Sequence, residues 1–555
     1  MSSGEGPIGP GDPSIPPPPP PGFEPPETGE HPPMVSQMVG ADFQEQQPRS
    51  RKKWIFGGVG AAVLALVAGG GAWAVIQFLS SSGDPVTSAL PDTTVAFAAI
   101  DLDPSASQKI AAIEFMSKFP GITDNLSFDP KSSNDLRKWF TDSIAHDSSC
   151  PNFSFDTQIA PWLGKRAAVA GAPNAGGTLT PFGVIQVTDQ QKAKDAIANN
   201  FGCQDTSGTS QPTGIAFVGQ YLVLADKQAD ADYFAQQAKS SPLQNDADYQ
   251  AMMAKVGDPG IAMAYVSPNA AAQLVDQLTT QTGLSSPLTD AQKQQLDSFK
   301  GAALAVRFNG GAIETQVVMS TDGSTTAQGA ASPVADLPDS TALAFGNGYA
   351  PGAGADAVKK VWDQLKQNDP TYQRDVRGVE SQTGLTLPDD LVTLFGNGYA
   401  FAVDSSLDPN IFNSPTVPDG SAFPVGFRLV GDPQAISAVL QKIDALVRPA
   451  GIRLYAVKGD GVVGASMSSS YAKQLAGSGG LGATDSYKSA VSGQPVPDGV
   501  LYANMGDIAS WIQKVSKNDP STQSTLDNMA PLDAFGMSSH TDGNDLSREF
   551  RLTTH

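Results

Sequence analysis

The chain has 555 residues, of which 40% are hydrophobic and 16% are charged, so it has enough material for several folded domains. Its 56 acidic and 35 basic residues give a formal net charge of −21. This excess of negative charge argues against binding to nucleic acid or broad adhesion to anionic lipid surfaces, since both need clustered lysine and arginine.

Residues 1–53 are predicted to form a disordered, proline-rich tail. They contain an uninterrupted proline run from Pro16 to Pro21 and few aliphatic residues. Such a segment has too little apolar area to offset the entropy cost of ordering, and it favours polyproline II conformations.

A transmembrane helix is predicted over residues 54–79, where WIFGGVGAAVLALVAGGGAWAVIQFL contains no charged residue. This run exceeds the ~20 apolar residues that cross a bilayer, and it is too long and begins too late for a cleavable signal peptide. Four basic residues stand directly before it: Arg49, Arg51, Lys52 and Lys53. The positive-inside rule therefore predicts a plasma-membrane protein with a cytoplasmic tail and an extracytoplasmic C-terminal portion.

Small residues recur at every fourth position of this segment, at Gly57, Ala61, Ala65 and Gly69. This spacing is compatible with a weak homodimer formed through the transmembrane helix.

After a linker at residues 80–89, the chain repeats itself. LPDTTVAFAAIDLDPSASQKIAAI, which begins at Leu90, resembles LPDSTALAFGNGYAPGAGADAVKKV, which begins at Leu337, and further matching segments follow in the same order. The polar segment 321–336 separates the two series. We therefore predict two diverged copies of one module, at residues 90–320 and 337–555, which form either two domains or one continuous sheet.

Each copy is predicted to be α+β, with a mixed or largely antiparallel sheet and helices on one face. Val95–Ile100 is a short apolar run typical of a strand, and Ile215–Val218 with Tyr221–Leu224 indicates a hairpin. Asp-Pro or Ser-Pro pairs, which can cap and start a helix, occur at Asp103-Pro104, Ser267-Pro268 and Asp432-Pro433.

The proline-rich tail, the apolar span and the phrase LPDTTVAFAAIDLDPSASQKIAAIEFMSKFPG resemble an uncharacterised family of membrane-anchored envelope proteins from actinobacteria and cyanobacteria. That family is known only as a domain of unknown function. The resemblance implies an envelope location and implies no activity and no site residues.

No metal site or cofactor site is predicted. His146 and His540 are the histidines available to a folded site, and the sequence has no HExxH, paired CxxC or EF-hand spacing. One nucleophile pattern is present, because Ser470 and Lys473 form a Ser-x-x-Lys motif. The Lys-Thr-Gly segment that completes such acylating sites is absent, so an exposed helix is the simpler interpretation.

Cys150 and Cys203 are the only cysteines, and we predict that they form one disulfide in an oxidising compartment. The alternative is a pair of free thiols.

The sequence predicts a non-catalytic, membrane-anchored protein of the cell envelope with a structural, binding or interaction role. Its partner would be a wall component, a lipid or another protein. The alternative is an envelope serine hydrolase that uses Ser470 and Lys473.

Overall fold

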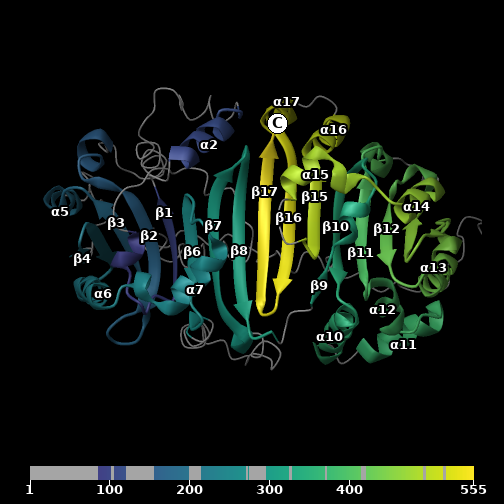
Figure 1. Cartoon of the computed structure of the whole chain (residues 1–555), viewed down its shortest axis with the longest axis horizontal. Helices are drawn as coiled ribbons and strands as arrows, with labels where there is room; N and C mark the ends of the chain where they lie inside the picture. Colours follow the sequence, from purple (N-terminus) through teal and green to yellow (C-terminus); the bar gives the residue numbers. More distant parts are fainter. Residues whose placement is uncertain are drawn as a thin grey trace, which may run out of the picture. The chain divides into compact units, whose positions relative to one another are not determined.

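The computed structural model describes residues 85–101, 106–119, 155–198, 214–270, 273, 296–323, 328–368, 372–413, 420–491, 496–516 and 520–555. Within these residues all strand pairs are antiparallel and belong to one sheet of 17 strands (Figure 1). The predicted tail and the predicted transmembrane segment 54–79 lie outside the described residues. In the part that is described, no helix combines the length and the apolar character needed to cross a membrane.

The first half of the sheet is made by residues 96–321. In space its strands follow the order β4, β5, β3, β2, β1, β6, β7, β8. Their bounds in chain order are β1 Ala96–Asp101, β2 Leu163–Pro173, β3 Leu179–Val187, β4 Gly214–Val218, β5 Tyr221–Ala225, β6 Ala262–Val266, β7 Phe299–Asn309 and β8 Ala312–Thr321.

The second half pairs its strands in the same way, in the spatial order β13, β14, β12, β11, β10, β15, β16, β17. Their bounds are β10 Thr341–Tyr349, β11 Gly398–Asp404, β12 Val425–Val430, β13 Tyr455–Lys458, β14 Val462–Ser466, β15 Gly499–Asn504, β16 Leu532–Asp542 and β17 Asp545–Thr554. The short β9 (Gly329–Ala330) pairs with the end of β10.

The last strands of the two halves join them into one sheet. β8 pairs with β17 from Ala312↔Thr553 to Ser320↔Asp545, and the two strands lie side by side in Figure 1. Of the two arrangements that the sequence left open, separate domains or a continuous sheet, the described residues adopt the continuous sheet.

The helices that accompany the first half are η3 Val86–Ala89, α2 Ala106–Met116, η4 Phe155–Ile159, α5 Gln190–Ala198, α6 Gln228–Ser240, η6 Leu243–Asn245 and α7 Ala247–Val256. Those of the second half are η7 Pro333–Asp336, α10 Ala353–Asn368, α11 Tyr372–Thr383, α12 Asp389–Phe395, η8 Pro409–Asn413, η9 Gly420–Ala422, α13 Pro433–Val447, η10 Arg448–Ala450, α14 Ser469–Ala476, η11 Leu481–Ala483, α15 Asp485–Ala490, α16 Met505–Ser516 and α17 Pro520–Met529.

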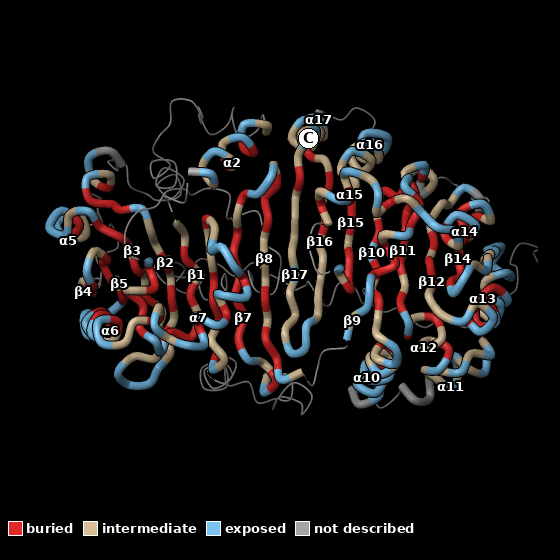
Figure 2. The backbone as a smooth tube through the Cα atoms, in the orientation of Figure 1, coloured by how far each residue is buried: buried red, intermediate tan, exposed pale blue. Residues whose placement is uncertain are grey.

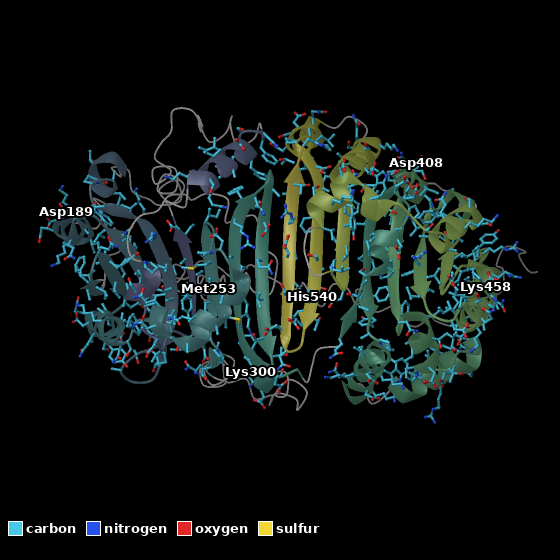
Figure 3. All side chains as sticks on the ribbon, viewed as in Figure 1. Asp189, Met253, Lys300, Asp408, Lys458 and His540 are labelled. Carbon is cyan, nitrogen blue, oxygen red and sulfur yellow. The ribbon has the colours of Figure 1, made fainter. Side chains whose placement is uncertain are left out.

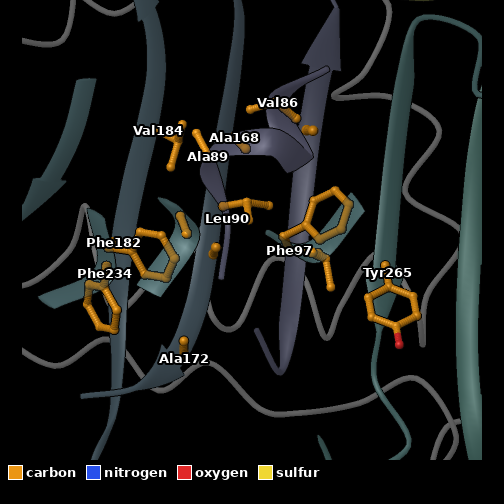
Figure 4. Close-up of a cluster of buried hydrophobic side chains, with 14 of the residues drawn as sticks. Val86, Ala89, Leu90, Phe97, Ala168, Ala172, Phe182, Val184, Phe234 and Tyr265 are labelled. Carbon is orange, nitrogen blue, oxygen red and sulfur yellow. The ribbon is translucent and has the colours of Figure 1, made fainter. Parts of the chain in front are cut away.

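Helices cover both faces of the sheet, so the expectation of helices on one face is wrong. On the face that we call face A, Phe97 packs in a cluster with η3, α6 and α7, part of which is drawn in Figure 4. On the opposite face B, α2 packs against Leu304 of β7. The physical reason is visible in β7, whose residues from Gly301 to Val306 are buried in succession, so both of its faces need cover (Figure 2).

The second half shows the same division. η7, α14 and α15 pack with Ala344 and Tyr502 on face A, whereas α12 and α13 pack with Leu429 and Val463 on face B. The predicted α+β class with a largely antiparallel sheet therefore agrees with the structure.

Parts of both segments expected to be linkers are packed into the fold. Val86 and Ala89 of η3 are buried, and so are Pro333 and Val334 of η7. The leucine after each short helix accepts a backbone hydrogen bond from a later leucine. Leu90 O accepts from Leu243 N at 2.8 Å, and Leu337 O accepts from Leu481 N at 3.0 Å. The folded region thus begins before the two matching LPD phrases.

Candidate functional site

The Ser-x-x-Lys motif lies on α14 and is not part of an enclosed site. Ser470 and Lys473 are both exposed. The Ser470 hydroxyl is 3.0 Å from the hydroxyl of Ser468, the residue that caps the helix. An open hollow of about 390 Å³ lies beside the end of α14, and its lining includes neither Ser470 nor Lys473: Pro338, Asp339, Ser340, Gln474, Gly477, Ser478, Gly479 and Gly480.

The other residues singled out from the sequence are not gathered into a site. Cys150, Cys203 and His146 lie outside the described residues. His540 lies on β16 (Figure 3), where its Nδ1 is buried and has no hydrogen-bond partner among the described residues. Among the residues that the structure describes, no group of three or more His, Cys, Asp or Glu side chains could hold a metal ion.

The feature that stands out is a row of large apolar side chains across face B. Each member is the direct register partner of the next, from β12 through β11, β10, β15 and β16 to β17: Phe427, Phe401, Phe345, Leu501, Met537 and Phe550. We call this set the apolar row. Five strand spacings of about 4.8 Å make it roughly 24 Å long.

The apolar row is only partly covered. Phe345 is 42% exposed although β10 lies inside the sheet, and the other five members are half-buried. The ring centroids of Phe345 and Phe401 are 5.1 Å apart, and those of Phe401 and Phe427 are 5.2 Å apart. Large apolar side chains that stay accessible in a contiguous set are typical of a binding surface.

A second set of apolar residues runs parallel to this row, two residues along each strand. Its members are again register partners: Val425, Val403, Leu343, Ala503, Phe535 and Leu552. Val403 and Ala503 are buried, whereas Leu343 and Phe535 are half-buried. The apolar surface is therefore two rows of side chains wide on this flank.

The opposite flank is polar. Two residues along the strands in the other direction, the register partners are Tyr399, Asn347, Gly499, Ser539 and Arg548. We call this set the polar row. It lies ~7 Å from the apolar row, the rise of two residues in a strand.

Gly499 lets the polar side chains beside it approach one another. A Cβ at this position would collide with Ser539 Oγ and Asn347 Oδ1, so both side chains reach over the glycine. Asn347 Nδ2 donates a hydrogen bond to Tyr399 Oη at 3.2 Å. The Ser539 hydroxyl donates to Asp498 Oδ1 at 2.8 Å.

Charges near the polar row are unevenly distributed. Asp498 is buried, and its Oδ2 accepts a hydrogen bond from the amide of Thr541 at 2.8 Å. Burial, with smaller contributions from Tyr399 and Asp498, raises the pKa of Tyr349, so this phenol stays neutral. Arg548 is exposed and makes no ion pair with any described residue.

Sequence reasoning missed this surface, although a signal was present. TALAFGNGY and GYAFAVD alternate large residues with Ala or Gly, so each of these strands has one bulky face and one flat face, and VGFRLV begins in the same way. Small residues at Ala344, Ala400 and Gly426 let α14 and α15 pack closely on face A. The bulky residues consequently gather on face B.

Comparisons with known proteins place the chain in a family without adding an activity. A family model described as "Protein of unknown function (DUF3352)" matches residues 58–463. No curated protein sequence matches the chain. A solved structure titled "Structure of crystal form I of TP0453" is similar at 8% identity and a TM-score of 0.20, and it covers 43% of this chain and 80% of its own.

Proposed function

Since the chain belongs to the DUF3352 family of proteins of unknown function, we propose a function from its own residues. It is a non-catalytic, membrane-anchored protein of the cell envelope that binds a lipid acyl chain along the apolar row on face B. One observation carries the proposal: Phe345 is 42% exposed in the interior of a sheet, within an unbroken row of large apolar side chains.

The chemistry of the row favours an acyl chain over a peptide. Each strand from β10 to β12 and from β15 to β17 is paired on both sides, so none offers free backbone groups to which a peptide strand could add. No member of the row carries a charge or a hydrogen-bonding side chain. Its length of roughly 24 Å exceeds the ~15 Å occupied by lipid tails in one leaflet, half of a ~30 Å bilayer core.

A binding role also agrees with the surroundings of the Ser-x-x-Lys motif. Ser470 and Lys473 are exposed on α14, and they form no hydrogen bond with each other among the described residues. An activated serine needs a base within hydrogen-bond reach, which this geometry lacks. The lack of such a base beside Ser470 supports a binding role rather than hydrolysis.

The acyl-chain proposal can be tested in native membranes with a photoactivatable fatty alcohol, followed by mapping of the labelled peptides of the full-length chain. We expect label on β10, β11, β15 and β16. Phe345→Asp should lower that label about tenfold, equivalent to ~1.4 kcal/mol and close to the ~1.5–3 kcal/mol gained by burying a phenylalanine.

Two controls accompany this experiment. Ile452→Asp changes a side chain of similar exposure, 38%, outside the apolar row and should leave the label unchanged. Label on residues 54–79 should also stay constant, because this segment is proposed to lie in the bilayer. If β10, β11, β15 and β16 carry no label in the unchanged protein, the proposal is wrong.

The location rests on the uncharged run 54–79 and on the basic residues before it. We propose that the N-terminus is cytoplasmic and that the sheet is extracytoplasmic. Protease added to intact, wall-permeable cells should then digest the C-terminal portion and spare an N-terminal tag. Protection of the C-terminal portion would contradict this topology.

The origin of the sheet belongs to the same proposal. We propose that residues 90–320 and 337–555 are diverged copies of one module. The identical order of strand pairing in the two halves supports this, as does the shared bond from the amide of Leu243 or Leu481 to the leucine of each LPD phrase.

A further inference from the structure

We infer that Arg548, at the β17 end of the polar row, binds the carboxylate of a fatty acid whose chain lies on the apolar row. The inference rests on the proposed acyl-chain function and specifies the ligand's headgroup. The observation behind this inference is that Arg548, which has no ion pair among the described residues, lies directly beside the apolar row.

Arg548 has the right position on the sheet. It precedes Phe550 of the apolar row by two residues on β17, so the two side chains leave the same face ~7 Å apart. Its register partners are Ser539 on β16 and Val317 on β8. A carboxylate held at Arg548 would therefore place its acyl chain at the β17 end of the apolar row.

The charge of Arg548 has no ion-pair partner among the described residues. Glu549, the next residue, projects from the opposite face and approaches Arg551 at 3.6 Å. The acidic group closest to the polar row in register is Asp498, and its two oxygens already accept hydrogen bonds from Ser539 and Thr541. In a chain with a net charge of −21, an exposed arginine without an ion pair among the described residues is a selective position for an anion.

The guanidinium of Arg548 suits a small, planar anion. A guanidinium can bind both oxygens of a carboxylate with two parallel hydrogen bonds. The hydroxyl of Ser539, the register partner of Arg548, already donates to Asp498, so Arg548 alone supplies the charged contact. One guanidinium balances the single negative charge of a fatty-acid carboxylate, and the register partners Ser539 and Val317 add no second positive charge for a multiply charged headgroup.

The test compares a photoactivatable fatty acid with the fatty alcohol of the same chain length, both on the full-length chain in native membranes. The unchanged protein should bind the acid on the order of tenfold better, judged by label on β10, β15 and β16. Arg548→Gln should lower labelling by the acid to the level of the alcohol and leave labelling by the alcohol unchanged. Arg548→Lys should retain part of the preference.

The matched control is Arg453→Gln, since Arg453 is an exposed arginine that stacks on Tyr455, far from the polar row in register. It should preserve the preference for the acid. Equal labelling by acid and alcohol in the unchanged protein would overturn the headgroup assignment and leave the acyl-chain function standing. Absence of label from both probes would instead refute that function. If a lysophospholipid displaces the acid at equal concentration, the carboxylate assignment is wrong.

Discussion

Glu314 on β8 is a buried carboxylate held by arginines from both halves of the sheet. Its side chain is 4% exposed, and it accepts hydrogen bonds from Arg307 Nε at 2.5 Å and from Arg551 Nη1 at 2.6 Å. Arg307 belongs to the first half and Arg551 to the second. Desolvation opposes the burial of such charges, so the arrangement is stable only because each charge has a partner.

We predict that Glu314→Ala lowers the free energy of unfolding by about 3–5 kcal/mol, because Arg307 loses its ion-pair partner and Arg551 keeps, among the described residues, only Glu549, at 3.6 Å. Chemical denaturation of the purified protein measures this loss. Asp363→Ala, which breaks the exposed pair with Lys366, serves as the control and should change stability by less than about 0.5 kcal/mol. Equal effects of the two substitutions would contradict the prediction.

Asp545 at the start of β17 introduces a dependence on pH. Burial acts to raise its pKa, but hydrogen bonds from Lys255 and Ser320, with the lysine's charge, hold this pKa below the ordinary value. A depressed folded pKa stabilises the fold fully above the unfolded value near 4, and this contribution is lost as the pH falls through the folded pKa.

The corresponding prediction compares the unchanged protein with Asp545→Asn at about pH 6 and at about pH 3. At the higher pH the unchanged protein should have the higher urea midpoint of unfolding. The gap should narrow at the lower pH, because the carboxylate becomes protonated. A gap that widens on acidification would show that this ion pair does not stabilise the fold.

At the scale of single elements, the start of α13 was predictable from the sequence. Asp432 accepts hydrogen bonds from the amides of Gln434 at 2.8 Å and Ala435 at 3.5 Å, and Pro433 occupies the first helical turn. Helix caps depend on neighbours in the chain, which is why a sequence reveals them. The β4–β5 hairpin was predictable for the same reason, since Gly219 provides the positive φ of 55° that its turn requires.

We predict that Asp432→Ala destabilises the protein by about 1 kcal/mol, since two amides at the helix start lose their acceptor. Asp460→Ala, at the exposed turn between β13 and β14, should have an effect below about 0.5 kcal/mol. Thermal unfolding of the two variants under identical conditions gives the comparison. A cap variant as stable as the control would show that this helix start contributes little.

The arrangement of elements across the sheet was less accessible to sequence analysis. The apolar row exists only because Phe345, Leu501 and Met537 fall in register, and a shift of one residue in any strand would turn its side chains to face A. Register between distant strands depends on packing over the whole sheet. The coverage of face B by α2 was missed for a similar reason, because α2 packs against Leu304 of β7, which lies far later in the chain.

At the scale of the whole molecule, the β8–β17 pair decides whether the halves are independent. The pair has nine register partners, and Gln316 lies opposite Glu549 near its middle. The turns that precede β8 and β17, at Gly310-Gly311 and Gly543-Asn544, are equally far from these two residues along their strands. The β8–β17 pair is therefore symmetric about Gln316 and Glu549, which agrees with the proposed duplication of one module.

We predict that chains covering residues 85–323 and 328–555 are not stable monomers when produced separately. Each would expose a ten-residue edge strand, β8 in one and β17 in the other, with a full row of unpaired backbone groups. The first half should self-associate through two copies of β8, and adding the second half should convert this species into a one-to-one complex, because the bonds from Glu314 to Arg551 form only between unlike halves. Sedimentation of each half alone and of the mixture measures both events. Two monomeric, folded halves that ignore each other would show that the continuous sheet is not needed for stability.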